Sequence, residues 1–193
     1  MKAFKLLLLT SAMTALAGNA LAADGTINFT GEIIAASCKV GANTGAVVGG
    51  DVGHQTVDVK LGKVSADSIS GTAGGGIAAG TNISLSLDCG ATGKDLSNVK
   101  LAFDPASGSG LDLKNNSLLK VTGGAGGVGI GLYNDQNQLI NLAANEGYTG
   151  EIVKEADDSY KATLNLRAGY VANGDTIVPG AANGTLPFTL SYE

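Results

Sequence analysis

The sequence predicts an all-β protein, an antiparallel β-sandwich of the immunoglobulin-like kind in one domain. Three observations lead to this fold class. Apolar and polar residues alternate in many short runs, glycine-rich stretches separate these runs, and no long segment after the N-terminal apolar run repeats its apolar residues every 3.6 positions. At 193 residues, 44% of them hydrophobic, the chain is long enough to bury one core.

The alternating runs predict the strands in chain order. Strands are expected over 27–33, 57–61, 83–89, 99–103, 128–132, 160–170 and 186–192, of which 160–170 is the longest. The stretches between them are typical of turns, because 71–80 and 123–131 are rich in glycine and 134–137 consists of Asn, Asp and Gln. Residues 139–145 are expected to form a turn or two of helix at most.

The first 22 residues have the three parts of a secretory signal peptide. A basic start is followed by an apolar run over 6–17, and Ala20 and Ala22 are the small residues that precede a cleavage site. A membrane anchor is the alternative, but the run is far shorter than the ~20 apolar residues that span a bilayer. We expect cleavage after Ala22, with a second candidate site after Ala17.

Export would place Cys38 and Cys89 in an oxidising compartment, where two lone cysteines usually pair. Closing a loop of this size stabilises a protein by roughly 4 kcal/mol in the chain-entropy model. The alternative is a reactive thiol, which is disfavoured because Lys39 is the only adjacent cation and no histidine is close in sequence. Since Cys38 follows the first predicted strand and Cys89 ends the third, we expect their disulfide to join the two faces of the sandwich.

The residue types used in catalysis and metal binding are scarce. One histidine, two cysteines and a net charge of −5 argue against a His/Cys zinc site and against a nucleic-acid-binding protein. Residues 124–129 fit Gly-x-Gly-x-x-Gly, but a strand-like run follows where a nucleotide-binding fold has a helix. His54 belongs to no triad pattern. Asp135, Asp157 and Asp158 lack the spacing of a calcium loop. The sequence therefore predicts no catalytic residue, no cofactor and no metal site, and thus not an enzyme.

The last predicted strand has features of a sheet edge. Phe188, Leu190 and Tyr192 share one face, while Pro187 is out of phase with them and lacks the backbone N–H that a central strand donates. An apolar strand at an edge invites pairing with another strand, because its backbone groups otherwise have no partner strand.

Both ends of the chain resemble the subunits of chaperone–usher fimbriae, in particular the major pilins of type 1-like pili. The family pattern begins with Phe-x-Gly-x-Ile/Val and a cysteine, matched here by 29–33 and Cys38, and continues with Val-x-Leu-Gly-x-Val, matched by 59–64. Its second cysteine is also present. The family ends with a glycine fourteen residues from the C-terminus and a penultimate tyrosine, which here are Gly180 and Tyr192.

This resemblance implies an incomplete sandwich that lacks its seventh strand and is completed by a donor strand from a neighbouring subunit. A periplasmic chaperone would lend a strand first. An outer-membrane usher would then export a head-to-tail polymer of identical subunits through the periplasm to the cell surface, as a fimbrium that supports adhesion. On the matching positions, the donor residues are Gly25, Ile27 and Phe29, and the acceptor edge, which also contacts the chaperone, consists of Gly180, Phe188, Leu190 and Tyr192.

These assignments divide the chain into a signal peptide (1–22), an N-terminal donor arm (23–30) and a pilin β-sandwich domain (31–193). Family arms are usually longer than 23–30. Either cleavage follows Ala17, or part of the acceptor groove stays unfilled. A minor or adaptor pilin and a secreted carbohydrate-binding sandwich are the alternative functions. The second has little support, because the chain has no Trp and its nine Phe and Tyr residues lie mostly in strand phase.

Overall fold

The computed structural model describes residues 38–69, 76–77 and 79–193. The predicted strand over 27–33 and the proposed signal peptide and donor arm therefore lie outside the described residues. The described strands are β1 (Lys39–Thr44), β2 (Ala46–Gly49), β3 (Thr56–Val59), β4 (Gly80–Gly90), β5 (Asn98–Phe103), β6 (Leu119–Lys120), β7 (Val128–Tyr133), β8 (Tyr148–Lys154), β9 (Tyr160–Ala172) and β10 (Phe188–Tyr192). The helices are α1 (Ala66–Ile69) and the 3-10 turns η1 (Ala91–Asp95), η2 (Pro105–Ser107) and η3 (Leu142–Ala144).

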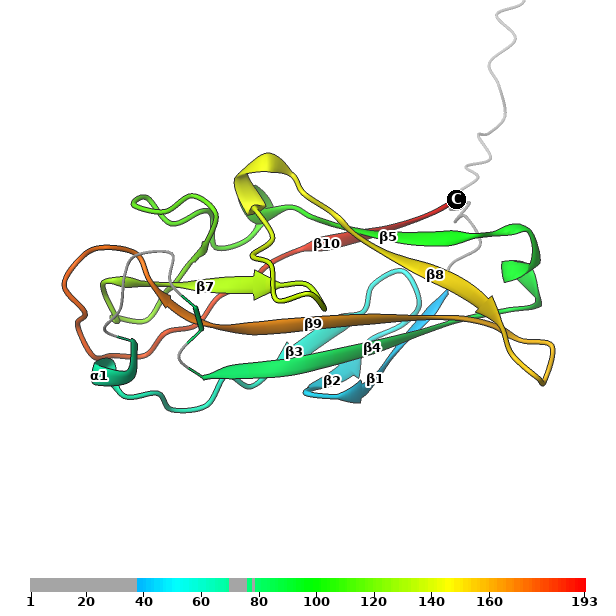
Figure 1. Ribbon diagram of the computed structural model, residues 1–193, viewed down its shortest axis with the longest axis horizontal. Helices are drawn as coiled ribbons and strands as arrows, with labels where there is room; N and C mark the ends of the chain where they lie inside the picture. The colour runs from blue at the N-terminus through cyan, green and yellow to red at the C-terminus, as the bar shows by residue number, and fades with distance from the viewer. Residues whose placement is uncertain (1–37, 70–75, 78) are drawn as a thin grey trace, which may run out of the picture. The chain divides into compact units, whose positions relative to one another are not determined.

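The strands pair in the order β1-β4-β9-β8-β5-β10, and every pair is antiparallel. Figure 1 shows β5 and β10 in one layer and β1, β4 and β9 in the other. β8 connects the layers, because residues 148–151 pair with β5 and residues 152–154 pair with β9. The expected antiparallel sandwich is thus confirmed.

The core lies between these layers, and alternate residues of several strands contribute to it. Leu87 on β4, Leu101 on β5 and Leu164 on β9 are almost completely buried. The strands predicted over 83–89, 99–103, 128–132 and 160–170 correspond to β4, β5, β7 and β9. Burying one face is the physical reason for the alternation in β4, β5 and the first part of β9, whereas every residue of β7 is buried.

Two predicted strands extend beyond the strands of the structure. β3 ends at Val59 and not at Leu61, and β10 begins at Phe188 and not at Leu186. In both cases the apolar alternation continues beyond the paired segment. Leu61 and Leu186 line a cavity and do not belong to a strand.

The sequence did not predict β8, because a glycine interrupts its apolar face. Tyr148 and Ile152 point inward on either side of Gly150. A Cβ atom on Gly150 would lie 2.5 Å from Cδ2 of Leu164, so the packed core leaves no room for a side chain there. An apolar residue that would have completed the alternating pattern is therefore excluded by packing.

The expected disulfide between Cys38 and Cys89 is present, but its expected placement is wrong. Cys38 directly precedes β1, and β1 pairs with β4, which contains Cys89. With Lys39 opposite Asp88, the two cysteines face each other across one ladder, with Cα atoms 4.0 Å apart. The bond therefore joins neighbouring strands of one layer, not the two faces of the sandwich. The strand that decides this follows Cys38 in the chain and had not been predicted.

Candidate functional site

The last strand, β10, has one strand neighbour among the described residues, which is β5. The backbone groups directed at β5 belong to odd-numbered residues, because Asp104 N donates to Pro187 O and Glu193 N donates to Asn98 O, both at 2.9 Å. Successive residues of a strand direct their N–H and C=O groups to opposite edges. The backbone groups of Phe188, Leu190 and Tyr192 therefore point away from β5, towards an edge that a further strand can pair with.

The side chains of β10 are divided between two environments. Thr189 and Ser191 are exposed, whereas Phe188, Leu190 and Tyr192 are half-buried on the inner face. The shared apolar face expected from the sequence is confirmed. Half-burial of inward-facing apolar side chains indicates that the sandwich is not covered along this edge.

A cavity of about 860 Å³ lies beside this edge. One wall is the chain from Gln55 to Gly62, which includes β3, and the other is 182–188, which leads into β10. Its floor is mostly apolar and consists of Ile83, Leu85, Leu101, Phe103, Leu119, Ile130, Leu132, Leu166, Ala168 and Tyr170. The core of the sandwich is thus open to an apolar occupant between these two walls.

A second cavity of about 420 Å³ continues the first. Gly62, Tyr170, Ala182 and Asn183 line both cavities, and the second extends to α1 on one side and to residues 177–181 on the other. From the first cavity to the second, residue numbers rise along one wall and fall along the other, so the chain runs in opposite directions along the two walls. We call the two cavities together the edge groove, which extends from Phe188 at one end to the region of Gly180 at the other.

Gly180 belongs to the wall of the second cavity. A Cβ atom at this position would lie 2.6 Å from both Ala125 N and Gly124 C, so only glycine allows this close approach of two backbones. The family resemblance assigned Gly180 to the same acceptor edge as Phe188, Leu190 and Tyr192. In the structure it precedes β10 by eight positions, because an irregular segment joined to 122–126 by isolated bridges comes first.

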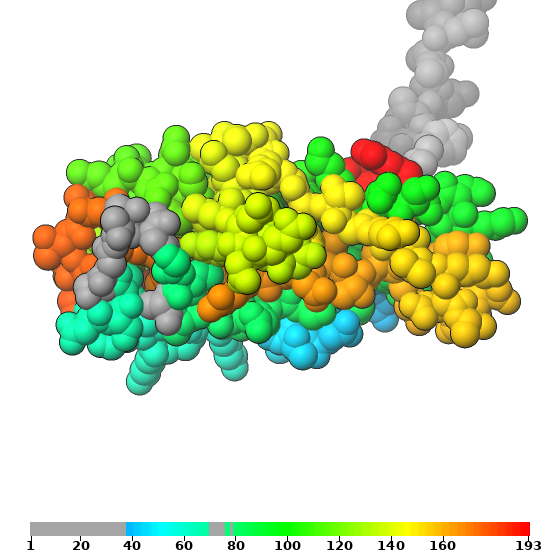
Figure 2. Space-filling model, viewed as in Figure 1, coloured from blue at the N-terminus to red at the C-terminus, as the bar shows by residue number. Residues whose placement is uncertain are grey.

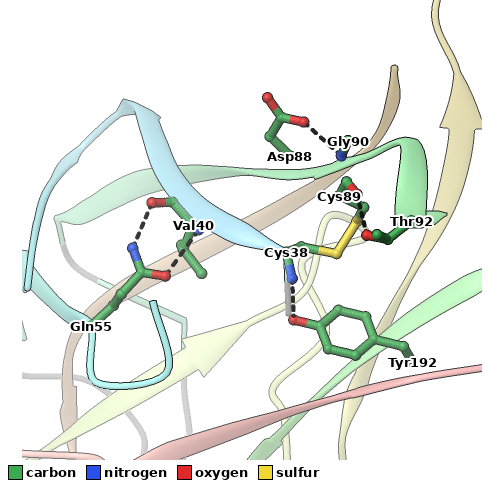
Figure 3. The surroundings of a disulfide bond; sticks show 8 residues. All are labelled: Cys38, Val40, Gln55, Asp88, Cys89, Gly90, Thr92 and Tyr192. Atoms are coloured by element: carbon green, nitrogen blue, oxygen red, sulfur yellow. Dashed lines mark hydrogen bonds between the residues drawn. A yellow bond between two sulfur atoms is a disulfide. The ribbon is translucent and has the colours of Figure 1, made fainter. Parts of the chain in front are cut away.

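Two tyrosines anchor the chain along this groove. The Tyr170 hydroxyl donates to the carbonyl oxygen of Ala182 at 2.8 Å, which ties one wall to β9. The Tyr192 hydroxyl accepts from Cys38 N at 3.1 Å and links β10 to the start of β1 (Figure 3). Burial raises the pKa of both phenols above 10.0, and for Tyr192 the Cys38 bond acts in the opposite direction. Both side chains are therefore neutral hydrogen-bonding groups at physiological pH.

The structure brings together part of the predicted site. Phe188 lines the first cavity and Gly180 the second, whereas Leu190 and Tyr192 share the open strand edge but line neither cavity. The predicted donor residues Gly25, Ile27 and Phe29 lie outside the described residues.

The wall formed by 55–62 was missed as part of the site. Its alternation indicated a strand and residues 59–64 matched a family motif, but local sequence does not say which edge a strand will face.

Metal-binding residue types are scattered in the part of the chain that the structure describes. Groups of three or more metal-binding side chains are absent there. Asp157 accepts bonds from the backbone and hydroxyl of Ser159, which hold the pKa of its carboxyl below 3.8. Likewise, none of the helices described is both long and apolar enough to cross a membrane.

Comparison with known proteins gives consistent findings. The model of the fimbrial protein family matches residues 27–193. The chain is 31% identical to the long polar fimbria protein A of Salmonella typhimurium, over 98% of this chain and 97% of that protein. It is also 31% identical to a type-1 fimbrial protein subunit of Serratia marcescens, over the full length of both. Among solved structures, a tip adhesin from Pseudomonas aeruginosa shares the fold, with a TM-score of 0.54 and 22% identity over 80% of this chain and 38% of the adhesin.

Proposed function

This chain belongs to the fimbrial protein family and is a structural pilus subunit, not an enzyme, and from that premise we propose that its copies join by donor-strand exchange. In this mode, the arm at 23–30 of one subunit enters the edge groove of the next and becomes the missing strand of its sandwich. The observation that carries the proposal is the open edge of β10 beside an apolar groove.

The chemistry of the arm suits this groove. Gly25, Ile27 and Phe29 alternate with polar residues, so that one face of an extended arm is apolar and the other polar. Burying Ile27 and Phe29 would contribute about 1.5–3 kcal/mol each. Each backbone hydrogen bond with the outward groups of β10 adds about 0.5–1.5 kcal/mol net. Leaving the groove would also expose the core floor, which slows dissociation.

The open groove also requires protection before assembly. We propose that the chain is exported by the signal peptide at 1–22 into the periplasm, where a chaperone lends a strand to β10 and an usher then exchanges it for the arm of the next subunit. The same outward groups of Phe188, Leu190 and Tyr192 would pair with the chaperone first and with the arm later. The product is a surface fimbrium built of identical subunits, with a role in cell adhesion.

A truncated chain tests the polarity of assembly. A mature chain that lacks Ala23 to Thr30 retains the groove but has no arm, so it should bind the chaperone and occupy only a terminal position in the fibre. The measurement is electron microscopy with an epitope label on the truncated chain. Label at interior positions of the fibre would refute donor-strand exchange.

A matched pair of charge substitutions tests the apolar face of the arm. Ile27→Asp places a carboxylate in the apolar groove, whereas Asn28→Asp places the same charge on the outward face. We expect Ile27→Asp to abolish polymerisation and Asn28→Asp to preserve it, measured as the yield of high-molecular-weight fibre on gels run without boiling. Equal yields from the two variants would contradict the proposed inward face of the arm.

A further inference from the structure

At one end of the edge groove, a side chain takes the place of a neighbouring strand. The Gln55 amide bonds both backbone groups of Val40: Val40 N donates to Oε1 at 3.0 Å, and Nε2 donates to Val40 O at 2.9 Å (Figure 3). This pair of bonds has the pattern by which two residues of adjacent strands bond each other. Gln55 therefore occupies the hydrogen-bonding positions that a strand added beside β1 would use.

The Tyr192 hydroxyl bonds the backbone two residues before Val40, where it accepts a single hydrogen bond from Cys38 N. Cys38 and Val40 direct their backbone groups to the same edge, because they are two positions apart. The hydroxyl of Tyr192 bonds Cys38 N, and the amide of Gln55 bonds Val40 (Figure 3). The two side chains come from opposite sides of the groove, Tyr192 from β10 and Gln55 from the segment before β3. Tyr192 thus links β10 to the residue before β1, and Gln55 links the segment before β3 to β1.

The lining of the groove ends near these links. On one wall the lining begins at Gln55, and on the other it ends at Phe188, although β10 continues to Tyr192. The cavity space for inward side chains of an inserted strand therefore extends from the region of Gly180 to Phe188. The disulfide also holds Cys38 to β4, so the start of β1, which Gln55 and Tyr192 bond, is fixed in place.

A strand in this groove needs such an end point. A shift of two residues leaves every side chain of an alternating arm on its original face, so alternation alone does not select one register. We propose that Gln55 and Tyr192 are positioning residues that stop the inserted strand and so set its register. This inference rests on the proposed donor-strand exchange, because it concerns how far the arm of the neighbouring copy enters.

Cross-linking within assembled fibres tests the register directly. Thr189, which is exposed on β10, is replaced by cysteine, and Asp24, Thr26, Asn28 and Thr30 are replaced by cysteine one at a time. These arm positions lie on the outward face, and the Cα atoms of disulfide-bonded residues are usually about 4.4–6.8 Å apart, so only close neighbours cross-link. Fibres are oxidised after assembly, and the cross-linked peptides are identified by mass spectrometry.

With Gln55 and Tyr192 intact, we expect one arm position to account for nearly all cross-links to position 189. In Gln55→Ala, cross-links should also appear at the arm position two residues away. Tyr192→Phe, which removes only the hydroxyl, should shift the distribution in the same direction by a smaller amount. A residue that merely stabilises the fold would lower the yield of fibres without spreading the register.

Asn134→Ala is the matched control, since Asn134 also bonds two backbone amides, those of Gln136 and Gln138, in a turn that does not line the groove. It should keep the single cross-link. The same single cross-link in Gln55→Ala and Tyr192→Phe would overturn the inference. If Gln55→Ala forms no fibres, Tyr192→Phe alone decides. Absence of any cross-link between the arm and β10 in otherwise unaltered subunits would instead overturn donor-strand exchange itself.

Discussion

β9 and β10 have the same alternation of apolar and polar residues but very different surroundings. β9 pairs with β4 along one edge and with β8 and β7 along the other, and Leu164 at its centre is fully buried. β10 pairs with β5 along one edge, and its inward side chains remain half-buried. Alternation therefore determines which residues face inward, and the number of neighbouring strands determines how deeply they are buried.

The same contrast is visible on the surface. In Figure 2, the chain from β7 to β9, coloured from yellow-green to orange, covers the middle of the face turned to the viewer. On the edge groove, by contrast, core residues such as Leu101 and Leu132 line a cavity. A polymer that forms by strand addition needs both regions, one stable enough to hold the fold and one open enough to receive a partner.

The largest expected effect comes from the disulfide, which lies where the two regions meet. Replacing both Cys38 and Cys89 by serine frees a loop with a sequence separation of 51 residues, and the free energy of unfolding should fall by about 4 kcal/mol. Urea denaturation of the mature chain measures this change. A loss below about 1 kcal/mol would mean that β1 is held to β4 without the covalent bond.

A pair of truncations compares the two regions directly. Leu164→Ala removes a fully buried side chain and should lower the free energy of unfolding by about 2–5 kcal/mol. Phe188→Ala removes a half-buried ring from the open wall and should cost only about 1 kcal/mol in the mature chain alone. Once a synthetic peptide of residues 23–34 fills the groove, the cost of Phe188→Ala should rise towards that of Leu164→Ala. Equal costs before peptide is added would contradict an open groove.

The smallest expected effect is a dependence on alkaline pH at Tyr192. Because burial raises the folded-state pKa of Tyr192 above the ordinary 10.0, its contribution to stability is complete below pH 10 and is lost as the pH rises through the raised pKa. The temperature of thermal unfolding should therefore fall between pH 9 and 11, and it should fall less steeply in Tyr192→Phe. Tyr133, whose pKa burial also raises, should keep its own share of the decline in that variant.

Sequence reasoning succeeded where the signal was local. The faces of β4, β5, β7 and β9 followed from alternation, and the pairing of the cysteines followed from their number. It failed where a distant group altered the local pattern. Gly150 on β8 is a glycine because the side chain of Leu164 fills its place, and that contact joins residues fourteen positions apart in the chain.

The site shows the same division. Phe188, Leu190 and Tyr192 were placed on one face of a last strand by their spacing alone. The sequence did not show that the wall opposite them is 55–62, nor that Gln55 bonds β1 at the end of that wall. Gln55 carries no signal of its own, because a single polar residue before a strand does not indicate which group it will bond.

By itself the sequence determined which residues point inward, which two cysteines pair, and that the chain ends in an apolar strand of edge type. These properties depend on residue type and on a period of two, which are local. Only the tertiary structure decided which strands are neighbours, that the disulfide lies within one layer, and where the groove begins and ends. Those properties depend on contacts between distant segments, and a shift of two residues would leave the local pattern unchanged.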